Sequence, residues 1–185
     1  MRPVKLIPNL LSAARMALAP YLFLLLWRHQ YDIALAVCFV AGFTDLLDGF
    51  IARHYKATSR LGAYLDPVAD KVLLSGMFVT LAMDGAINKW LAMLVLGRDL
   101  FILLAVGGAF LFTAQRNFPP SIWGKASTAA QILFMFVFLL WICGWADARL
   151  LDLMKWITVA LTAWSGIHYA LRGVRYSGVF QHTSQ

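Results

Sequence analysis

Long apolar stretches alternate with short polar breaks along the 185 residues of the chain. Six of these stretches reach the length of about 20 residues that a helix needs to cross a membrane. They comprise residues 6–27, 32–53, 62–83, 90–113, 122–144 and 150–171. The breaks between them are polar or contain Gly or Pro, which favour turns. The pattern predicts an all-α integral membrane protein, a six-transmembrane-helix bundle that forms a single domain over residues 1–185.

The composition supports this prediction. Hydrophobic residues make up 61% of the chain and charged residues only 14%, whereas soluble domains are roughly 45–50% apolar. Cys38 and Cys143 stand alone in apolar stretches, which excludes a disulfide framework and a zinc-ligand pattern. The net charge of +7 comes from basic residues that lie mainly at the ends of the stretches. We therefore expect the lipid bilayer, and no nucleic acid, as the partner of these charges.

Basic residues are distributed unevenly between the two sides of the predicted bundle. One side carries nine Lys and Arg residues, at positions 2, 5, 53, 56, 60, 116, 125, 172 and 175, and the other carries four, at positions 28, 89, 149 and 155. The positive-inside rule then predicts that both termini face the cytoplasm. The end of the second stretch and the start of the third lie on this cytoplasmic side. We expect the membrane to be a bacterial inner membrane.

Four of the nine acidic residues, all of which are Asp, lie within 26 residues of one another: Asp45, Asp48, Asp66 and Asp70. The first two close the second stretch and the last two open the third. A charge in a membrane helix costs about 2.5–3.5 kcal/mol on insertion scales, so it normally faces a bundle interior or cavity and marks a functional site. The spacings i, i+3 and i, i+4 place each pair on one helix face. We expect the two faces to oppose each other, because consecutive helices are antiparallel neighbours.

Four converging carboxylates repel one another unless cations or protons relieve the repulsion. Carboxylate oxygens are the ligands that Mg²⁺ and Mn²⁺ prefer, and the pattern contains no His or Cys for zinc. Two divalent cations, Mg²⁺ or Mn²⁺, held by shared carboxylates can clamp a phosphoryl group during displacement. The small residues Gly49, Ala52 and Gly62 would let a phosphorylated ligand approach the helix backbones. One carboxylate could act as general base.

A lone D-x2-D-G motif also fits a solvated helix end, but the full pattern fixes eight residues over 26 positions. Two other classes of protein remain as alternatives, a cation transporter and a non-catalytic scaffold. Transporter sites tend to lie at the membrane midplane in repeated halves. Here the acids gather at one end and no repeat is visible. An enzyme is therefore the favoured interpretation.

In these residues the sequence resembles the CDP-alcohol phosphotransferase family of membrane enzymes. The matching residues are Asp45, Asp48, Gly49, Ala52, Arg53, Gly62, Asp66 and Asp70. The resemblance implies that the four Asp residues bind two divalent cations and that Asp70 also acts as base on the acceptor hydroxyl. It assigns the CDP-lipid site to Asn9, Thr44, Gly49, Ala52, Arg53 and Gly62. It further implies displacement at the β-phosphorus of CDP-diacylglycerol, release of CMP, and a homodimer.

The segment from Ile7 to Arg15 is similar to the first-helix motif of the branch that makes phosphatidylglycerophosphate and cardiolipin, although this branch commonly has Thr in place of Ser12. The motif makes Asn9 a candidate for the nucleotide side of the site. The alternative is that Pro8 and Asn9 only form a helix-entry turn.

The acceptor is predicted from the fourth and fifth stretches. Phosphatidylglycerophosphate synthases usually have a second Arg where Ala105-Val106 stands, whereas Gly97-Arg98-Asp99 and residues 124–131 look more like cardiolipin synthases. That branch often has Asn in place of Ser127. The expected function is therefore phosphatidyl transfer to phosphatidylglycerol, with glycerol 3-phosphate as the alternative acceptor.

Arg98 and Lys125 are the residues that we expect at the acceptor phosphate. Their alternatives are an internal Arg98–Asp99 salt bridge and a loop Lys that only sets topology.

Overall fold

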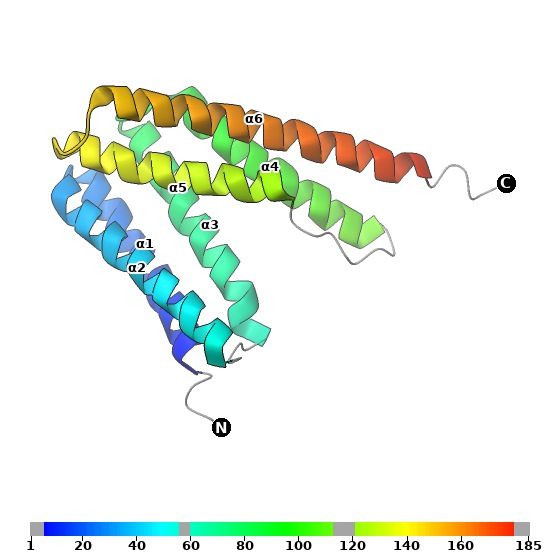
Figure 1. Ribbon diagram of the computed structural model, residues 1–185, viewed down its shortest axis with the longest axis horizontal. Coiled ribbons are helices and arrows are strands. Elements are labelled where there is room, and N and C mark those ends of the chain that lie inside the picture. Colours follow the sequence, from blue (N-terminus) through cyan, green and yellow to red (C-terminus); the bar gives the residue numbers. More distant parts are fainter. Residues whose placement is uncertain (1–5, 56–59, 113–120, 180–185) are drawn as a thin grey trace. The chain divides into compact units, whose positions relative to one another are not determined.

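The computed structural model describes residues 6–55, 60–112 and 121–179, with side chains for residues 16–44, 70–105 and 121–171. Within these ranges the regular structure is entirely α-helical (Figure 1). The helices are α1 (Leu6–Trp27), α2 (Tyr31–Tyr55), α3 (Arg60–Met83), α4 (Lys89–Phe112), α5 (Ile122–Ile142) and α6 (Ala148–Val179). The predicted all-α class is confirmed, and the predicted stretches coincide with the helices to within about two residues except at the end of α6.

The last helix continues eight residues beyond the predicted end at residue 171. The apolar pattern stops there because Arg172 and Arg175 follow. Arg is nevertheless a good helix former, so the backbone helix outlasts the apolar stretch. Hydropathy therefore gave the apolar part of α6 and not its full length.

Two helices among the described residues are long and apolar enough to cross a membrane. They are Ile122–Ile142 and Ala148–Leu171. Met16–Trp27 and Tyr31–Thr44 are shorter apolar helical segments. The existence of six helices is thus confirmed, while the crossing of the membrane by all six stays a prediction.

Three helices end in the same kind of turn. The residues just after α1, α3 and α5 with positive φ are His29 (56°), Gly85 (81°) and Gly144 (79°). In each turn an amide reaches back five residues: Gln30 to Leu25, Ala86 to Leu81, and Trp145 to Leu140, at 2.8–2.9 Å. These bonds satisfy carbonyls that the end of a helix leaves without a partner. Glycine fits the left-handed conformation of two of these turns without strain.

The chain divides into two compact units, which are described separately. Unit 1 comprises Met1–Asn88 and Phe138–Ala146, and unit 2 comprises Lys89–Val137 and Asp147–Gln185. In unit 1, α1 packs on α3 and on α2. Buried residues recur at helical spacing on α1 and α3. Leu22 and Leu26 of α1 and Phe78 and Leu81 of α3 are fully buried. The α1–α3 interface is thus the core of unit 1.

In unit 2, α4 packs on α6. Polar residues, and not only apolar ones, are buried among its helices. They are Arg98, Ser121, Ser127, Gln131, Thr158, Thr162 and Ser165. Buried polar groups are costly unless they are hydrogen-bonded, so their partners decide how this unit is held together.

Candidate active site

All eight residues of the aspartate pattern lie on two consecutive helices of unit 1. Asp45 and Asp48 lie in the last three turns of α2, and Asp66 and Asp70 lie in the first three turns of α3. Both pairs are therefore on continuous helix, as the shared-face prediction requires. Gly49, Ala52 and Arg53 follow on α2, and Gly62 precedes on α3.

The helix ends set the depth of each aspartate. Asp45 lies ten residues before Tyr55, where α2 ends, and Asp70 lies ten residues after Arg60, where α3 begins. With a rise of 1.5 Å per residue, both are about 15 Å from their helix ends. Asp48 and Asp66 are both about 10 Å from these ends by the same rise. In Figure 1, α2 and α3 run in opposite directions from neighbouring ends. Each helix thus carries one aspartate about 15 Å from its end and another about 10 Å from its end.

The described side chains at this site belong to Asp70, which is exposed, and Thr44, which is half-buried. The Thr44 hydroxyl donates a hydrogen bond to the carbonyl of Val40 at 2.7 Å, so its Oγ1 remains able to accept one from a ligand. Asn9 lies in the first turn of α1. Its side chain, and those of the other aspartates, Gly49, Ala52, Arg53 and Gly62, lie outside the part of the chain with described side chains.

The donor set of this site fits hard divalent cations. The four aspartates supply only carboxylate oxygens, which suit Mg²⁺ or Mn²⁺, and they come from the adjoining ends of two helices. Among the residues with described side chains, no three His, Cys, Asp or Glu gather as ligands. Three of the four aspartates lie outside that set. The assignment of a metal to these aspartates therefore stays a prediction, based on the type of donor and on the positions of the four residues along α2 and α3.

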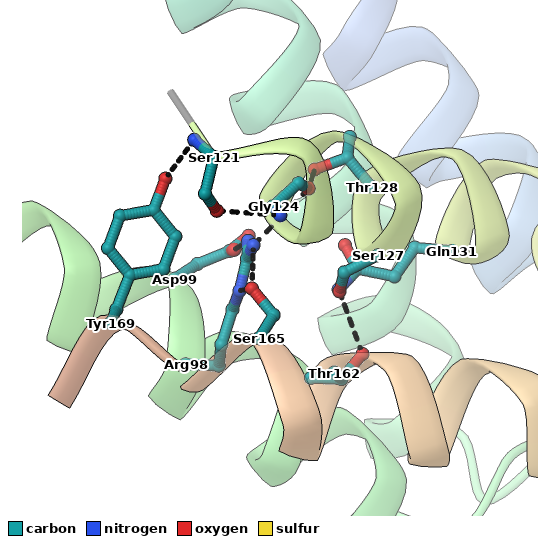
Figure 2. A network of polar contacts seen from close by, with 10 residues as sticks. All are labelled: Arg98, Asp99, Ser121, Gly124, Ser127, Thr128, Gln131, Thr162, Ser165 and Tyr169. Carbon is teal, nitrogen blue, oxygen red and sulfur yellow. Dashed lines mark hydrogen bonds and ion pairs between the residues drawn. The ribbon is translucent and has the colours of Figure 1, made fainter. Parts of the chain in front are cut away.

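Arg98 is the central residue of a second polar cluster, in unit 2 (Figure 2). Its side chain is 6% exposed and forms an ion pair with Asp99 in which Nη1 and Oδ1 are 2.7 Å apart. Nε and Nη2 both donate to the Oγ of Ser165, at 3.2 and 2.7 Å. Nη2 also donates to the carbonyl of Gly124 at 3.3 Å. Arg98 of α4 is thereby bonded to α5 and α6 as well as to its own neighbour.

These contacts bear on the predicted role of Arg98. The expectation that this charge faces inward is confirmed, and the internal salt bridge with Asp99 is present. A guanidinium has five N–H groups, and the four hydrogen bonds use four of them. The remaining N–H, on Nη1, is the one that a phosphate could take without displacing a protein acceptor. In the described contacts Arg98 thus fixes the packing of unit 2 and retains one N–H group for a substrate.

The start of α5 is fixed next to this cluster. Ser121 caps the helix, because its Oγ accepts a hydrogen bond from the Gly124 amide at 3.0 Å. The Ser121 amide in turn donates to the Tyr169 hydroxyl of α6 at 3.0 Å. Lys125, the second predicted acceptor residue, is exposed in the first turn of α5. The structure thus places Lys125 directly after the glycine whose carbonyl accepts from Arg98.

A row of hydroxyl groups continues from this cluster along α5 and α6. Ser127 and Thr162 are hydrogen-bonded at 3.2 Å, and the Gln131 amide nitrogen donates to both hydroxyls at 3.3 Å. Further along, Thr158 donates to the Ala130 carbonyl at 3.1 Å. Gln131 Oε1 is buried without a hydrogen-bond partner in the part of the chain that the structure describes. Ser127, where the resembling branch often has Asn, thus belongs to an interhelical network.

Residues 5–164 match the family model for CDP-alcohol phosphatidyltransferase. The chain belongs to the CDP-alcohol phosphatidyltransferase family. The matched residues include all four aspartates, Asn9, Arg98 and Lys125. The resemblance that the aspartate pattern indicated is confirmed.

Named relatives of this phosphatidyltransferase-family chain fall into two groups. The chain is 34% identical over 194 residues to cardiolipin synthase (CMP-forming) of Rattus norvegicus, covering 91% of this chain and 63% of the rat protein. It is 32% identical over 173 residues to CDP-diacylglycerol--glycerol-3-phosphate 3-phosphatidyltransferase of Aquifex aeolicus, covering 91% of this chain and 96% of that protein. The chain thus spans slightly less than two thirds of the rat protein.

Sequence reasoning missed two residues of this cluster in this family member: Ser165, which accepts hydrogen bonds from Arg98, and Tyr169, which accepts one from the Ser121 amide. Ser165 and Tyr169 lie beyond the matched residues 5–164, and neither was predicted as a site residue. One signal was present in the sequence, because Thr158, Thr162 and Ser165 recur at intervals of four and three in an apolar stretch. Such spacing places three hydroxyls on one helix face, where membrane helices hydrogen-bond to one another.

Proposed function

We propose that this chain is a membrane phosphatidyltransferase that transfers the phosphatidyl group of CDP-diacylglycerol to phosphatidylglycerol, giving cardiolipin and CMP. The observation that carries the proposal is the aspartate pattern at matching depths on α2 and α3, inside the residues matched by the family. The names of the relatives, which include cardiolipin synthases, support it.

In the proposed reaction, a hydroxyl oxygen of the acceptor attacks the β-phosphorus of CDP-diacylglycerol. The new phosphorus–oxygen bond forms as the bond between the β-phosphorus and the bridging oxygen breaks, and CMP leaves with this oxygen. The proton of the acceptor hydroxyl goes to the Asp70 carboxylate. Its exposed position on α3 leaves Asp70 accessible to a substrate. A carboxylate in such a position typically contributes a factor of about 10²–10⁴ as a general base.

Asp45, Asp48, Asp66 and Asp70 are the residues that would hold two divalent cations. Mg²⁺ or Mn²⁺, when bound, would neutralise the charge of the diphosphate. Asn9, Thr44, Gly49, Ala52, Arg53 and Gly62 form the proposed CDP-lipid site. Of these, Thr44 has a described side chain, and its free lone pairs suit a ligand hydroxyl or amine.

The acceptor phosphate is assigned to Arg98 and Lys125. Arg98 offers one N–H group and a fixed positive charge. Lys125 is an exposed point charge in the first turn of α5, directly after Gly124, whose carbonyl accepts a hydrogen bond from Arg98. Glycerol 3-phosphate is the second candidate acceptor, because the Aquifex relative is matched over 96% of its length and its name specifies that acceptor.

The membrane arrangement completes the proposal. All six helices span a bacterial inner membrane, both termini face the cytoplasm, and the aspartates lie at the cytoplasmic ends of α2 and α3. The uneven distribution of Lys and Arg supports this orientation. The family resemblance leads us to propose a homodimer as well.

A comparison of the two candidate acceptors, each supplied separately, tests the proposed function. Purified protein in vesicles is given CDP-diacylglycerol with a labelled acyl chain, Mg²⁺, and either phosphatidylglycerol or glycerol 3-phosphate. We expect labelled cardiolipin with phosphatidylglycerol, and no product after chelation of the metal with EDTA. Product with glycerol 3-phosphate alone would establish the alternative acceptor, and product that resists EDTA would contradict the metal assignment.

A further inference from the structure

A groove of about 430 Å³ lies between α4 and α6 in unit 2. Its volume is within the range of about 300–1,000 Å³ that is typical of small-molecule sites. Met93, Phe101 and Ile167 line it and are themselves exposed, at 68%, 43% and 54%. The groove is thus an open apolar surface and not a filled part of the core.

Small residues make the groove possible. Gly97 of α4 and Ala163 and Gly166 of α6 lie on its walls. A Cβ atom placed on Gly97 would meet no atom within 4 Å, and one on Gly166 would have Arg98 Cγ as its nearest neighbour, at 3.9 Å. The space beside both glycines is therefore free for a ligand.

The polar content of the groove is small and specific. Arg98 and Thr162 are the two polar residues that line the groove, and Arg98 is the charged one. The residues that α6 contributes lie between Thr162 and Ala170, inside the apolar segment Ala148–Leu171 that is long enough to cross a membrane. In the proposed membrane arrangement hydrocarbon surrounds this segment, so the matching occupant is an apolar chain attached to an anionic group.

We propose that this groove binds an acyl chain of the acceptor lipid, with the lipid phosphate at the remaining N–H group of Arg98. The inference rests on the proposed function and deepens it, because it makes the acceptor a phospholipid and not a water-soluble phosphate. The acceptor, and not the donor, is the assigned occupant because the CDP-lipid residues belong to α1, α2 and α3, whereas the groove and Arg98 belong to α4 and α6.

The groove contributes both packing contacts and position. An acyl chain that leaves the bilayer for a protein groove exchanges one apolar surrounding for another, so only packing contacts distinguish the two. A chain held beside Arg98 would nevertheless restrict the headgroup, and such orientation lowers the entropy cost of the reaction. Filling the groove should therefore raise the acceptor KM and leave donor binding unchanged.

Gly97→Leu fills the groove from α4, and Ala163→Leu fills it from α6. Neither needs the core to move, because Gly97 faces open space and Ala163 is exposed. Ala129→Leu is the matched control, since Ala129 is exposed on α5 and does not line the groove. In mixed micelles we expect each groove variant to raise the KM for phosphatidylglycerol roughly tenfold. The KM for CDP-diacylglycerol should stay within about twofold of that of the unmodified protein.

A binding readout separates this inference from the proposed function. Phosphatidylglycerol with a diazirine in one acyl chain is irradiated with the protein in the absence of CDP-diacylglycerol. We expect labelled peptides that contain Met93, Phe101 or Ile167, and a loss of labelling in both groove variants but not in Ala129→Leu. Unchanged labelling, or a raised KM for CDP-diacylglycerol in place of phosphatidylglycerol, overturns the proposal. If no acceptor yields CMP, the proposed function fails while the labelling pattern still decides the groove.

Discussion

The hydroxyl oxygen of Ser165 accepts two hydrogen bonds from Arg98, at 2.7 Å from Nη2 and 3.2 Å from Nε. Ser165 is fully buried on α6, and 67 residues separate the two partners in the chain. A neutral oxygen on one helix thus orients a guanidinium on another. Because Asp99 neutralises the same guanidinium, the arrangement keeps a buried charge paired and hydrogen-bonds four of its five N–H groups in the described contacts.

Removal of this hydroxyl should weaken unit 2. Ser165→Ala leaves two buried N–H donors without an acceptor, at a cost of about 1–3 kcal/mol. Thermal unfolding in detergent should show a lower Tm, and the acceptor KM should rise because Arg98 is no longer oriented. Ser165→Thr keeps a hydroxyl and is the control. Equal Tm and KM for Ser165→Ala and the unmodified protein would show that Arg98 is held without Ser165.

Gly124 should tolerate a methyl group poorly. A Cβ there would lie 3.1 Å from the Tyr169 hydroxyl, 3.2 Å from Ser121 Oγ and 3.3 Å from Arg98 Nη2. All three atoms belong to the hydrogen-bond network at the start of α5. Gly124→Ala should therefore lower the Tm, although Ala favours helix by about 1 kcal/mol over Gly.

Gly97→Ala is the matched control for Gly124→Ala, because its Cβ meets open space. It should gain helix propensity without any steric cost. A Tm that rises equally in both variants would contradict the tight packing at Gly124.

Gly76 should be required for the packing of α1 on α3. A Cβ on Gly76 would overlap the ring of Phe23. Overpacking of this kind typically costs about 1–3 kcal/mol, so Gly76→Ala should lower the Tm. In a double-mutant cycle, Phe23→Leu should remove most of this cost, since it takes away the ring that the methyl group meets. Additive effects of the two substitutions would exclude direct contact as the cause.

The helices could be predicted from sequence because their signals are local. Apolar stretches interrupted by Gly85 and Gly144 gave the ends of α3 and α5 to within about two residues. The aspartate pattern could be found for the same reason, since its residues lie within 26 positions and their spacing follows the helical repeat.

The contacts of Arg98 could not be predicted in this way. That Arg98 faces inward follows from its place in an apolar stretch. Its partners Ser165 and Gly124, however, are distant in sequence, and neither residue type by itself indicates a contact with an Arg. Which hydroxyl meets which donor depends on how α4, α5 and α6 pack. The groove beside Gly97 and Gly166 has the same origin, because it is a property of two helices and not of either stretch alone.

Asp70→Asn should remove turnover and largely spare CDP-lipid binding. The amide cannot accept the proton of the acceptor hydroxyl, so we expect the rate to fall at least about 100-fold. CMP release measures turnover, and equilibrium binding of labelled CDP-diacylglycerol measures affinity. Asp152→Asn is the control, because Asp152 is exposed on α6 and pairs only with a surface lysine, Lys155, in the described contacts. Turnover within a few-fold of normal in Asp70→Asn would contradict its role as base.

The fate of the β-phosphorus tests the central claim most directly. Protein reconstituted with phosphatidylglycerol and Mg²⁺ is given CDP-diacylglycerol that carries ³²P at the β-position, and the products are separated. Displacement at the β-phosphorus predicts that all transferred label appears in cardiolipin and that one unlabelled CMP is released for each cardiolipin formed. Label in CMP, or the absence of any labelled lipid product, would contradict the proposed transfer.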